Sequence, residues 1–244
     1  MLRKTQNSRS LKDNLMLASS TAFVAGAVNV TGLIAFFAFS SNVTGHVASL
    51  ANNIALVDME DVISFSLWLA SFFLGAYVSS YIIKSYDNFS NYKAYSIPLI
   101  IEIIILTMIA VYCDFFYEKK HIEGEVIVGF MLFSMGLQNG MASIISGGLI
   151  KSTHLTGLIT DLGAEIADYF HPKSDRPTFL KNKLFIRITI LSFYIMGGVI
   201  FGYCFYLFRF EILYVIPVIL MTILYYDVSS VYLNKFIGTL KNKR

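Results

Sequence analysis

The stretch "KSTHLTGLITDLGAEIADYF", residues 151–170, places three acidic side chains on one predicted short helix inside a strongly apolar chain. A fainter copy, "SSNVTGHVASLANNIALVDM", occupies residues 40–59. In both stretches a Thr-Gly pair, at 44–45 and at 156–157, precedes a segment with helical spacing. Two related short helices set among apolar segments indicate a duplicated membrane protein, and the flanking sequence repeats in the same order.

The composition is that of a membrane protein. The 244 residues are 56% hydrophobic and 14% charged, and a soluble domain of this size has too little interior to bury so much apolar surface. A helix needs about 20 mostly apolar residues to cross a hydrocarbon core about 30 Å thick. The sequence therefore predicts an all-α polytopic membrane helix bundle with six transmembrane helices. The stretches of sufficient length are about 15–38, 62–83, 94–113, 125–149, 186–208 and 212–233.

We expect a single membrane domain over residues 15–234, between basic tails at 1–14 and 235–244. The net charge of +3 is small, and the basic residues lie between and outside the apolar stretches. Such placement is a topology signal and not a nucleic-acid footprint. The lipid bilayer is thus the expected partner, no nucleic acid is expected, and a homo-oligomer is left open.

Two halves, about 15–117 and 125–234, repeat the same order of features. Each holds an apolar span, a Thr-Gly helix, a glycine-containing span and a span opened by a proline. The matching stretches are "AGAVNV" and "MGLQNG", "FFLGAYVSSY" and "YIMGGVIFGY", and "YSIPLII" and "LYVIPVI". Because this order holds over the whole length, chance similarity among apolar strings is the weaker explanation, and we predict an internal repeat.

The two Thr-Gly helices, from Gly45 to Val57 and from Gly157 to Phe170, span only about 20 Å at ~1.5 Å per residue. This is short of a full crossing. If both are re-entrant, each half has three crossings and the second half is inverted, as in many transporters. If both span, each half has four crossings and the halves are parallel. Segment length and, more weakly, the distribution of basic residues favour six crossings plus two short re-entrant or broken helices, with inverted halves and both termini in the cytoplasm.

Polar side chains gather where the apolar pattern breaks, in the connectors "FSSNVTG" and "KSTHLTG" and just after them. In lipid, irregular backbone persists only where protein or a wet cavity covers it. If the two helix N-termini face each other, their positive dipole ends would bind a polar or anionic solute; the alternative is that these residues only cap the helices. The candidates for a substrate or proton pathway are Asn42, Thr44, Gly45, Asn53, Glu102, Gln138, Asn139, His154, Thr156, Gly157, Asp161 and Glu165.

Asp161, Glu165 and Asp168 stand at i, i+4 and i+7, so they share one helical face. Two acids four residues apart in a low-dielectric site should not both stay ionised, and such pairs carry protons in coupled carriers. The alternative, favoured for Asp168, is that the face pairs with the basic run 173–187. The first half has Asn53 where the second has Glu165, which predicts a single asymmetric site.

Glu102 is a lone acid in an apolar stretch, about one turn after Pro98. Such a residue faces the bundle interior or extends to the membrane surface. Gln138 and Asn139 are more simply explained as interhelical hydrogen-bonding residues than as solute ligands. The sequence has no metal-ligand spacing, phosphate loop or Ser-His-Asp order, so we expect no catalytic residues, no metal and no cofactor.

The segment "MGLQNGMASIISGGLIKSTHLTGLITDLGAEIADY", together with "NVTGHVASLA", resembles the YoaK family of bacterial inner-membrane proteins, a domain of unknown function numbered 1275. Ser152 departs from the family, which often has a threonine there. The resemblance covers nearly the whole chain and implies a multi-pass protein of the bacterial inner membrane, without naming a substrate. The matching residues are Gly136, Leu137, Gln138, Asn139, Thr153, His154, Leu155, Thr156, Gly157, Thr160, Asp161, Leu162 and Gly163.

Three functions are compatible with these features. The first is a secondary transporter or permease for a small polar or anionic solute, with proton coupling through Asp161 and Glu165 as an option. The second is a non-transporting membrane scaffold or stress-response protein, whose polar residues only hold the bundle together. The third, a membrane enzyme acting on lipid, lacks a recognisable nucleophile or metal site in the sequence.

Overall fold

The computed structural model describes residues 9–86, 91–172, 175 and 177–226. Within these ranges the chain is helical and contains no strand, which confirms the all-α prediction. A 3₁₀ segment, η2 (Arg209–Tyr214), follows the last long helix, and a further helix covers residues 215–226. The helices before η2 are α1 (Leu11–Phe36), α2 (Val43–Leu56), α3 (Met59–Tyr86), α4 (Asn91–Phe115), α5 (His121–Ser146), α6 (Leu155–Phe170) and α7 (Thr178–Phe208).

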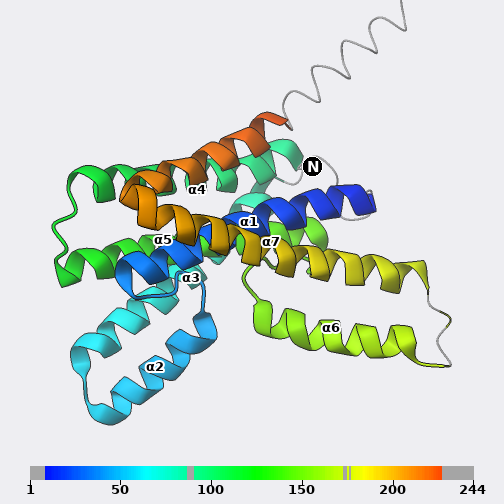
Figure 1. Ribbon diagram of the computed structural model, residues 1–244, viewed down its shortest axis with the longest axis horizontal. Helices are drawn as coiled ribbons and strands as arrows, with labels where there is room; N and C mark the ends of the chain where they lie inside the picture. Colours follow the sequence, from blue (N-terminus) through cyan, green and yellow to red (C-terminus); the bar gives the residue numbers. More distant parts are fainter. Residues whose placement is uncertain (1–8, 87–90, 173–174, 176, 227–244) are drawn as a thin grey trace, which may run out of the picture.

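In the described part of the chain, five helical segments are long and apolar enough to cross a membrane. The fifth, Thr178–Tyr226, includes α7, η2 and the helix after it. Figure 1 shows that the chain reverses its direction at η2, where Arg209 adopts a positive φ of 49°. The expected sixth span, 212–233, begins in η2 and continues in the helix over residues 215–226. Its residues 227–233 lie outside the described residues.

The first helix begins earlier than the apolar pattern predicted. Ser10 and Asp13 form a reciprocal capping box: the Ser10 hydroxyl accepts from the Asp13 N–H, and the Asp13 carboxylate accepts from the Ser10 N–H. This cap starts α1 at Leu11, inside the expected tail 1–14. Residues 1–8 and the expected tail 235–244 lie outside the described residues.

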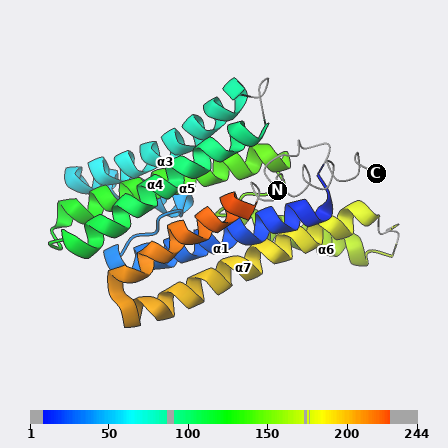
Figure 2. The ribbon, with the colours of Figure 1, turned by 90° about the horizontal axis from the view of Figure 1, so that it is seen from above.

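The long helices form two layers (Figure 2). One layer holds α3, α4 and α5, and the other holds α1, α7 and the helix over residues 215–226. Each layer thus combines the first helix of one expected half with later helices of the other half. The first helices, α1 and α5, run in opposite directions (Figure 1).

Reciprocal glycine contacts hold the closest pair in each layer. A Cβ at Gly26 of α1 would lie 2.0 Å from the Tyr194 carbonyl oxygen of α7, and one at Gly197 would lie 2.1 Å from the Phe23 carbonyl oxygen. No side chain fits there, so the two backbones touch directly. Such small-residue crossings are a common way to pack helices in a membrane, where burial from water supplies no driving force.

The pair α3 and α5 is built in the same manner. A Cβ at Gly75 would lie 2.1 Å from the Phe133 carbonyl oxygen, and one at Gly136 would lie 2.2 Å from the Phe72 carbonyl oxygen. In both layers, therefore, one glycine from each helix opens the backbone of its partner to direct contact. These four glycines lie in the stretches that the sequence comparison matched between the halves.

The short helices α2 and α6 begin near the middle of the molecule and run toward opposite ends (Figure 1). Left-handed residues end the helices before them: Phe37 (φ 57°) after α1, and Gly147 (φ 64°) after α5. The connector after each long helix then returns to the centre, and the short helix leads outward to the start of the next long helix (Figure 1).

Replacing Gly26 by alanine should destabilise the protein, because the added methyl group overlaps the Tyr194 carbonyl of α7. Overpacking of this kind costs about 1–3 kcal/mol. The matched control is Gly163→Ala in α6, where nothing lies within 4 Å of the added Cβ and where the better helix propensity of alanine should be neutral or stabilising. The midpoint of thermal unfolding in detergent measures the stability of both variants. Equal midpoints for Gly26→Ala and Gly163→Ala would contradict the close contact between Gly26 and the Tyr194 carbonyl.

Candidate functional site

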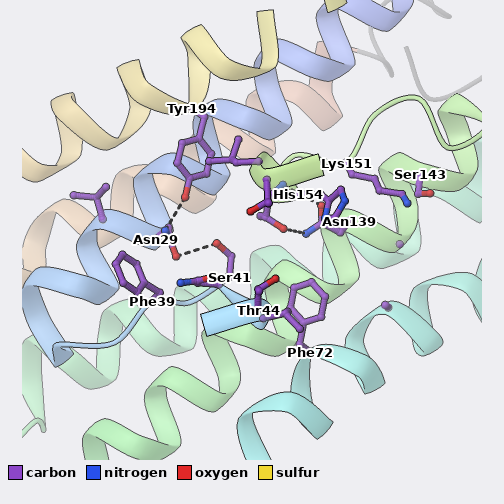
Figure 3. Close-up of a pocket in the computed structure, with 18 residues that line it drawn as sticks. Asn29, Phe39, Ser41, Thr44, Phe72, Asn139, Ser143, Lys151, His154 and Tyr194 are labelled. Atoms are coloured by element: carbon purple, nitrogen blue, oxygen red, sulfur yellow. Dashed lines mark hydrogen bonds between the residues drawn. The ribbon is translucent and has the colours of Figure 1, made fainter. Parts of the chain in front are cut away.

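A cavity of about 730 Å³ lies where the N-termini of α2 and α6 approach each other. Its walls come from α1, α3, α5 and α7 and from the two connectors, so both expected halves contribute (Figure 3). The polar side chains in its described lining are those of Asn29, Ser41, Asn42, Thr44, Asn139, Ser143, Lys151, Thr153, His154, Thr156 and Tyr194.

The two helix N-termini at the cavity are built alike but capped differently. The Asn42 side chain accepts a hydrogen bond from the Gly45 N–H at 3.1 Å and caps α2. His154 stands at the same position of α6 and makes no capping hydrogen bond with its side chain. The first-turn N–H groups of α6 thus lack the cap that Asn42 gives α2, and free N–H groups at a helix N-terminus attract negative charge.

The Thr-Gly pairs have a local steric reason. A Cβ at Gly45 would lie 2.4 Å from the Asn42 amide nitrogen, and one at Gly157 would lie 2.1 Å from His154 Nε2. The glycine lets the N-cap side chain fold across the first turn of its helix. This is the structural role of Gly45 and Gly157, which do not themselves line the cavity.

Asn29 of α1 organises the first connector. Its Oδ1 accepts from Ser41 Oγ at 2.9 Å and from Ser40 Oγ at 3.5 Å, and its Nδ2 donates to the Tyr194 hydroxyl at 2.6 Å (Figure 3). Within the same connector, the Phe39 carbonyl accepts from His46 Nε2 of α2 at 2.7 Å. The irregular backbone before α2 is thereby covered by side chains of the bundle.

Asn139 of α5 does the same for the second connector. Its Oδ1 accepts from the Thr153 N–H at 3.3 Å and from Ser152 Oγ at 3.4 Å, while its Nδ2 donates to Thr153 Oγ1 at 2.5 Å. The neighbouring Gln138, which is 1% exposed, donates from Nε2 to Ser152 Oγ and to the Thr21 carbonyl of α1. Gln138 is thus linked to Asn139 through Ser152. Gln138 itself does not line the cavity.

The electrostatic character of the cavity is positive. Its described lining includes one cationic side chain, Lys151, and no carboxylate. Two helix N-termini add partial positive charge, about half an elementary charge each. Across the described residues, no group of three or more His, Cys, Asp or Glu side chains is placed to hold a metal ion.

The acids of α6 do not line the cavity; two of them, Asp161 and Glu165, pair with Arg187 of α7. Arg187 Nε donates to Glu165 Oε2 at 2.8 Å, and Arg187 NH1 lies 3.0 Å from Asp161 Oδ2. Glu165 and Arg187 are 11% and 13% exposed, whereas Asp161 is 54% exposed. For Asp161 and Glu165 the structure has the alternative in which they meet the basic run, at Arg187; for Asp168, for which that alternative was favoured, no ion pair is seen among the described residues. Lys173 and Arg176 of that run lie outside the described residues.

The equivalent contact in the first half joins α2 to α3. Asn53 Nδ2, which occupies the position matched to Glu165, donates to Asp61 Oδ2 at 3.2 Å. His46 of α2 also packs against Trp68 of α3, with ring centroids 5.2 Å apart. Each short helix is therefore attached to the long helix that follows it, and neither Asn53 nor the acids of α6 line the cavity.

Of the twelve predicted site residues, five line the cavity together: Asn42, Thr44, Asn139, His154 and Thr156. Glu102 is fully buried in α4, so it does not extend to the membrane surface. Sequence reasoning missed Lys151, Ser41 and Tyr194 as lining residues. Ser41 and Lys151 stand in the quoted connectors and could have been found there, whereas Tyr194 reads as one more aromatic residue of an apolar span.

The family model described as "Protein of unknown function (DUF1275)" matches residues 17–226. The chain belongs to this family. It is also similar to the "UPF0700 transmembrane protein YoaK" of Bacillus subtilis (strain 168), with 26% identity over 185 residues that make up 75% of this chain and 80% of the relative. No solved structure matches it. The resemblance to the YoaK family is confirmed, and this DUF1275 protein is a multi-pass membrane protein.

In this DUF1275 protein, replacing Arg187 by glutamine should be strongly destabilising, because Glu165 would stay buried without its partner. Breaking a buried ion pair costs about 3–5 kcal/mol, to be measured as a lower unfolding midpoint in detergent. Adding Glu165→Gln should restore most of the loss. Asp161→Asn alone should have a small effect, since that carboxylate is half exposed. An Arg187→Gln protein as stable as the parent would contradict the role of the pair.

Proposed function

We propose that this protein is a secondary transporter for a small anionic solute, built from two inverted halves with six crossings and a re-entrant helix in each half. The observation that carries the proposal is the convergence of the α2 and α6 N-termini, one from each half, on a polar cavity in the middle of the bundle. Transporters of the inverted-repeat kind bind solutes at such broken helices near the bilayer midplane.

The opposite directions of α1 and α5 and the matched glycine crossings support an inverted duplication. Residues 147–154 contain two residues more than residues 37–42, yet both connectors are covered by one asparagine from the preceding helix. Three crossings in each half follow if α2 and α6 enter and leave on the same side.

The charges at the two ends of the bundle support an orientation in the bacterial inner membrane. The end that holds the α2–α3 turn, the α4–α5 turn and η2 (Figure 1) is acidic; the opposite end, where α1 begins, is basic. By the positive-inside rule the basic end is cytoplasmic, and so are both termini. The acidic end carries Asp58, Glu60, Asp61, Asp114, Glu118, Glu123, Glu125 and Glu211 against Lys119, Lys120 and Arg209.

An anion fits the cavity better than a neutral solute or a cation. Lys151 and two helix N-termini favour negative charge there, and no carboxylate of the described lining opposes it. The hydroxyls of Thr44 and Thr156 lie at the first turns of the two short helices, where they can donate to solute oxygens. The ion pair at Arg187 stabilises the α6–α7 hairpin in this proposal and does not contact solute.

The arrangement also suggests how access would alternate. The two layers meet at the cavity, and each layer contains helices from both halves. Rocking one layer against the other would expose the solute to one end of the bundle and then to the other. No catalytic residue or cofactor takes part.

A second candidate is a non-transporting membrane scaffold, and one observation favours it. Asn29 and Asn139 use both ends of their amides on their own connectors and on Tyr194. In this alternative the cavity is only the space left between two short helices, and no solute binds. Anion uptake by the purified protein separates the two functions.

Uptake into proteoliposomes should be tested with nitrate, sulfate, phosphate, acetate and pyruvate as labelled probes. We expect at least one to enter, and Lys151→Gln to weaken its uptake about tenfold to a hundredfold, since a hydrogen bond to a charged group is worth about 1.5–3 kcal/mol. Lys181→Gln changes the net charge equally on an exposed residue of α7 that does not line the cavity, and should leave uptake unchanged. An equal loss of anion uptake in both variants would show that the cavity does not bind the transported anion.

A further inference from the structure

Glu102 is a buried carboxylic acid that the cavity does not use. It stands near the middle of α4, is 0% exposed, and neither of its oxygens has a hydrogen-bond partner. The other acid buried among the described residues, Glu165, is paired with Arg187. Glu102 therefore differs from Glu165 in having no ion-pair or hydrogen-bond partner, and the burial of its carboxyl group needs a separate explanation.

No charged group of the neighbouring elements stands beside Glu102. Helix α4 packs against α3, α5 and η2, whereas Glu102 stands near the middle of α4 and the charged residues of α3 and α5 lie near the ends of those helices. Tyr77 and Tyr81 of α3 are exposed, and Tyr214 of η2 bonds Asp114 at the far end of α4. The charged groups concerned are Glu60, Asp61 and Lys84 on α3, His121, Glu123 and Glu125 on α5, and Arg209 and Glu211 on η2.

Two further buried polar atoms without a hydrogen-bond partner belong to α5, which packs against α4. An apolar groove between the helices is lined by Ile105 of α4 and Phe130 of α5, among others. The helices are antiparallel (Figure 1), so one turn further inward along each stripe come Glu102 on α4 and Ser134 on α5. The Ser134 hydroxyl and, one turn beyond it, the Gln138 Oε1 are also buried without a partner.

A chain of hydrogen bonds connects Gln138 of α5 to the cavity. Gln138 Nε2 donates to Ser152 Oγ at 3.0 Å, and Ser152 Oγ donates to Asn139 Oδ1 at 3.4 Å, where Asn139 lines the cavity. Gln138 also bonds the Thr21 carbonyl of α1, so the chain of hydrogen bonds crosses the contact between the two layers. Separation of the layers at this contact would admit water to this chain of hydrogen bonds.

An ionised carboxylate cannot persist where Glu102 lies, since an unpaired buried charge costs many kcal/mol. We propose that Glu102 carries a proton in the conformation described and releases it to water that reaches it along Ser134 and Gln138 when the two layers move apart. The side chain changes from neutral acid to carboxylate in that step, and the water chain takes the proton to the cavity. The release step rests on the proposed transport function; the protonated state does not.

Infrared spectroscopy of the purified protein in lipid tests the protonated state directly. We expect the C=O stretch of a protonated carboxylic acid at neutral pH, lost completely in Glu102→Gln and kept in Glu60→Gln, an exposed acid on α3. The unfolding midpoint of Glu102→Gln should match that of the parent, because glutamine keeps the size of the neutral acid. A spectrum without the acid band, or a band that survives Glu102→Gln, overturns the proposal.

The release step has a separate measurement. In proteoliposomes that take up a probe anion, an internal pH indicator should report proton movement with the parent protein, and Glu102→Gln should abolish it while Glu60→Gln preserves it. Proton movement that persists in Glu102→Gln overturns the release step. If the infrared band is present but no anion is taken up, the transport function and the release step that rests on it fail together, while the protonated state of Glu102 stands.

Discussion

Backbone that leaves a helix inside an apolar bundle must find hydrogen-bond partners within the protein, since lipid offers none. Asn29 and Asn139 supply those partners for the two connectors. Without them neither connector could return to the centre of the bundle, and α2 and α6 could not begin there. The central cavity, its positive character and the outward course of both short helices all follow from this constraint.

Direct backbone contact between helices gives the asparagines a rigid frame. Gly26 and Gly197 bring α1 against α7 so closely that Asn29, three residues beyond Gly26, reaches the Tyr194 hydroxyl. Gly136 lies three residues before Asn139 and brings α5 against α3 in the same way. Close packing thus determines where the polar residues stand, and each layer is held by helices from both halves of the chain.

Much of this arrangement could be predicted from the sequence, because its signals are local. The Thr-Gly pairs marked the two short helices, and the long apolar runs marked the other helices. The partner of Asp161 and Glu165 could not be chosen from sequence, because Arg187 lies 22 residues beyond Glu165 and meets it only through the α6–α7 hairpin. The start of α1 was misplaced because a cap of two polar residues, Ser10 and Asp13, sets it, and hydropathy does not register such a cap.

The contact of His46 with Trp68 has a practical consequence. Trp68 is the chain's one tryptophan, it is 7% exposed, and its indole N–H donates to the Glu125 carbonyl of α5 at 3.0 Å. Its ring is therefore in contact with α2 while it is anchored to the α3–α5 layer. The protein contains a native fluorophore at the joint between a short helix and its support, so displacement of α2 can be followed optically without any added label.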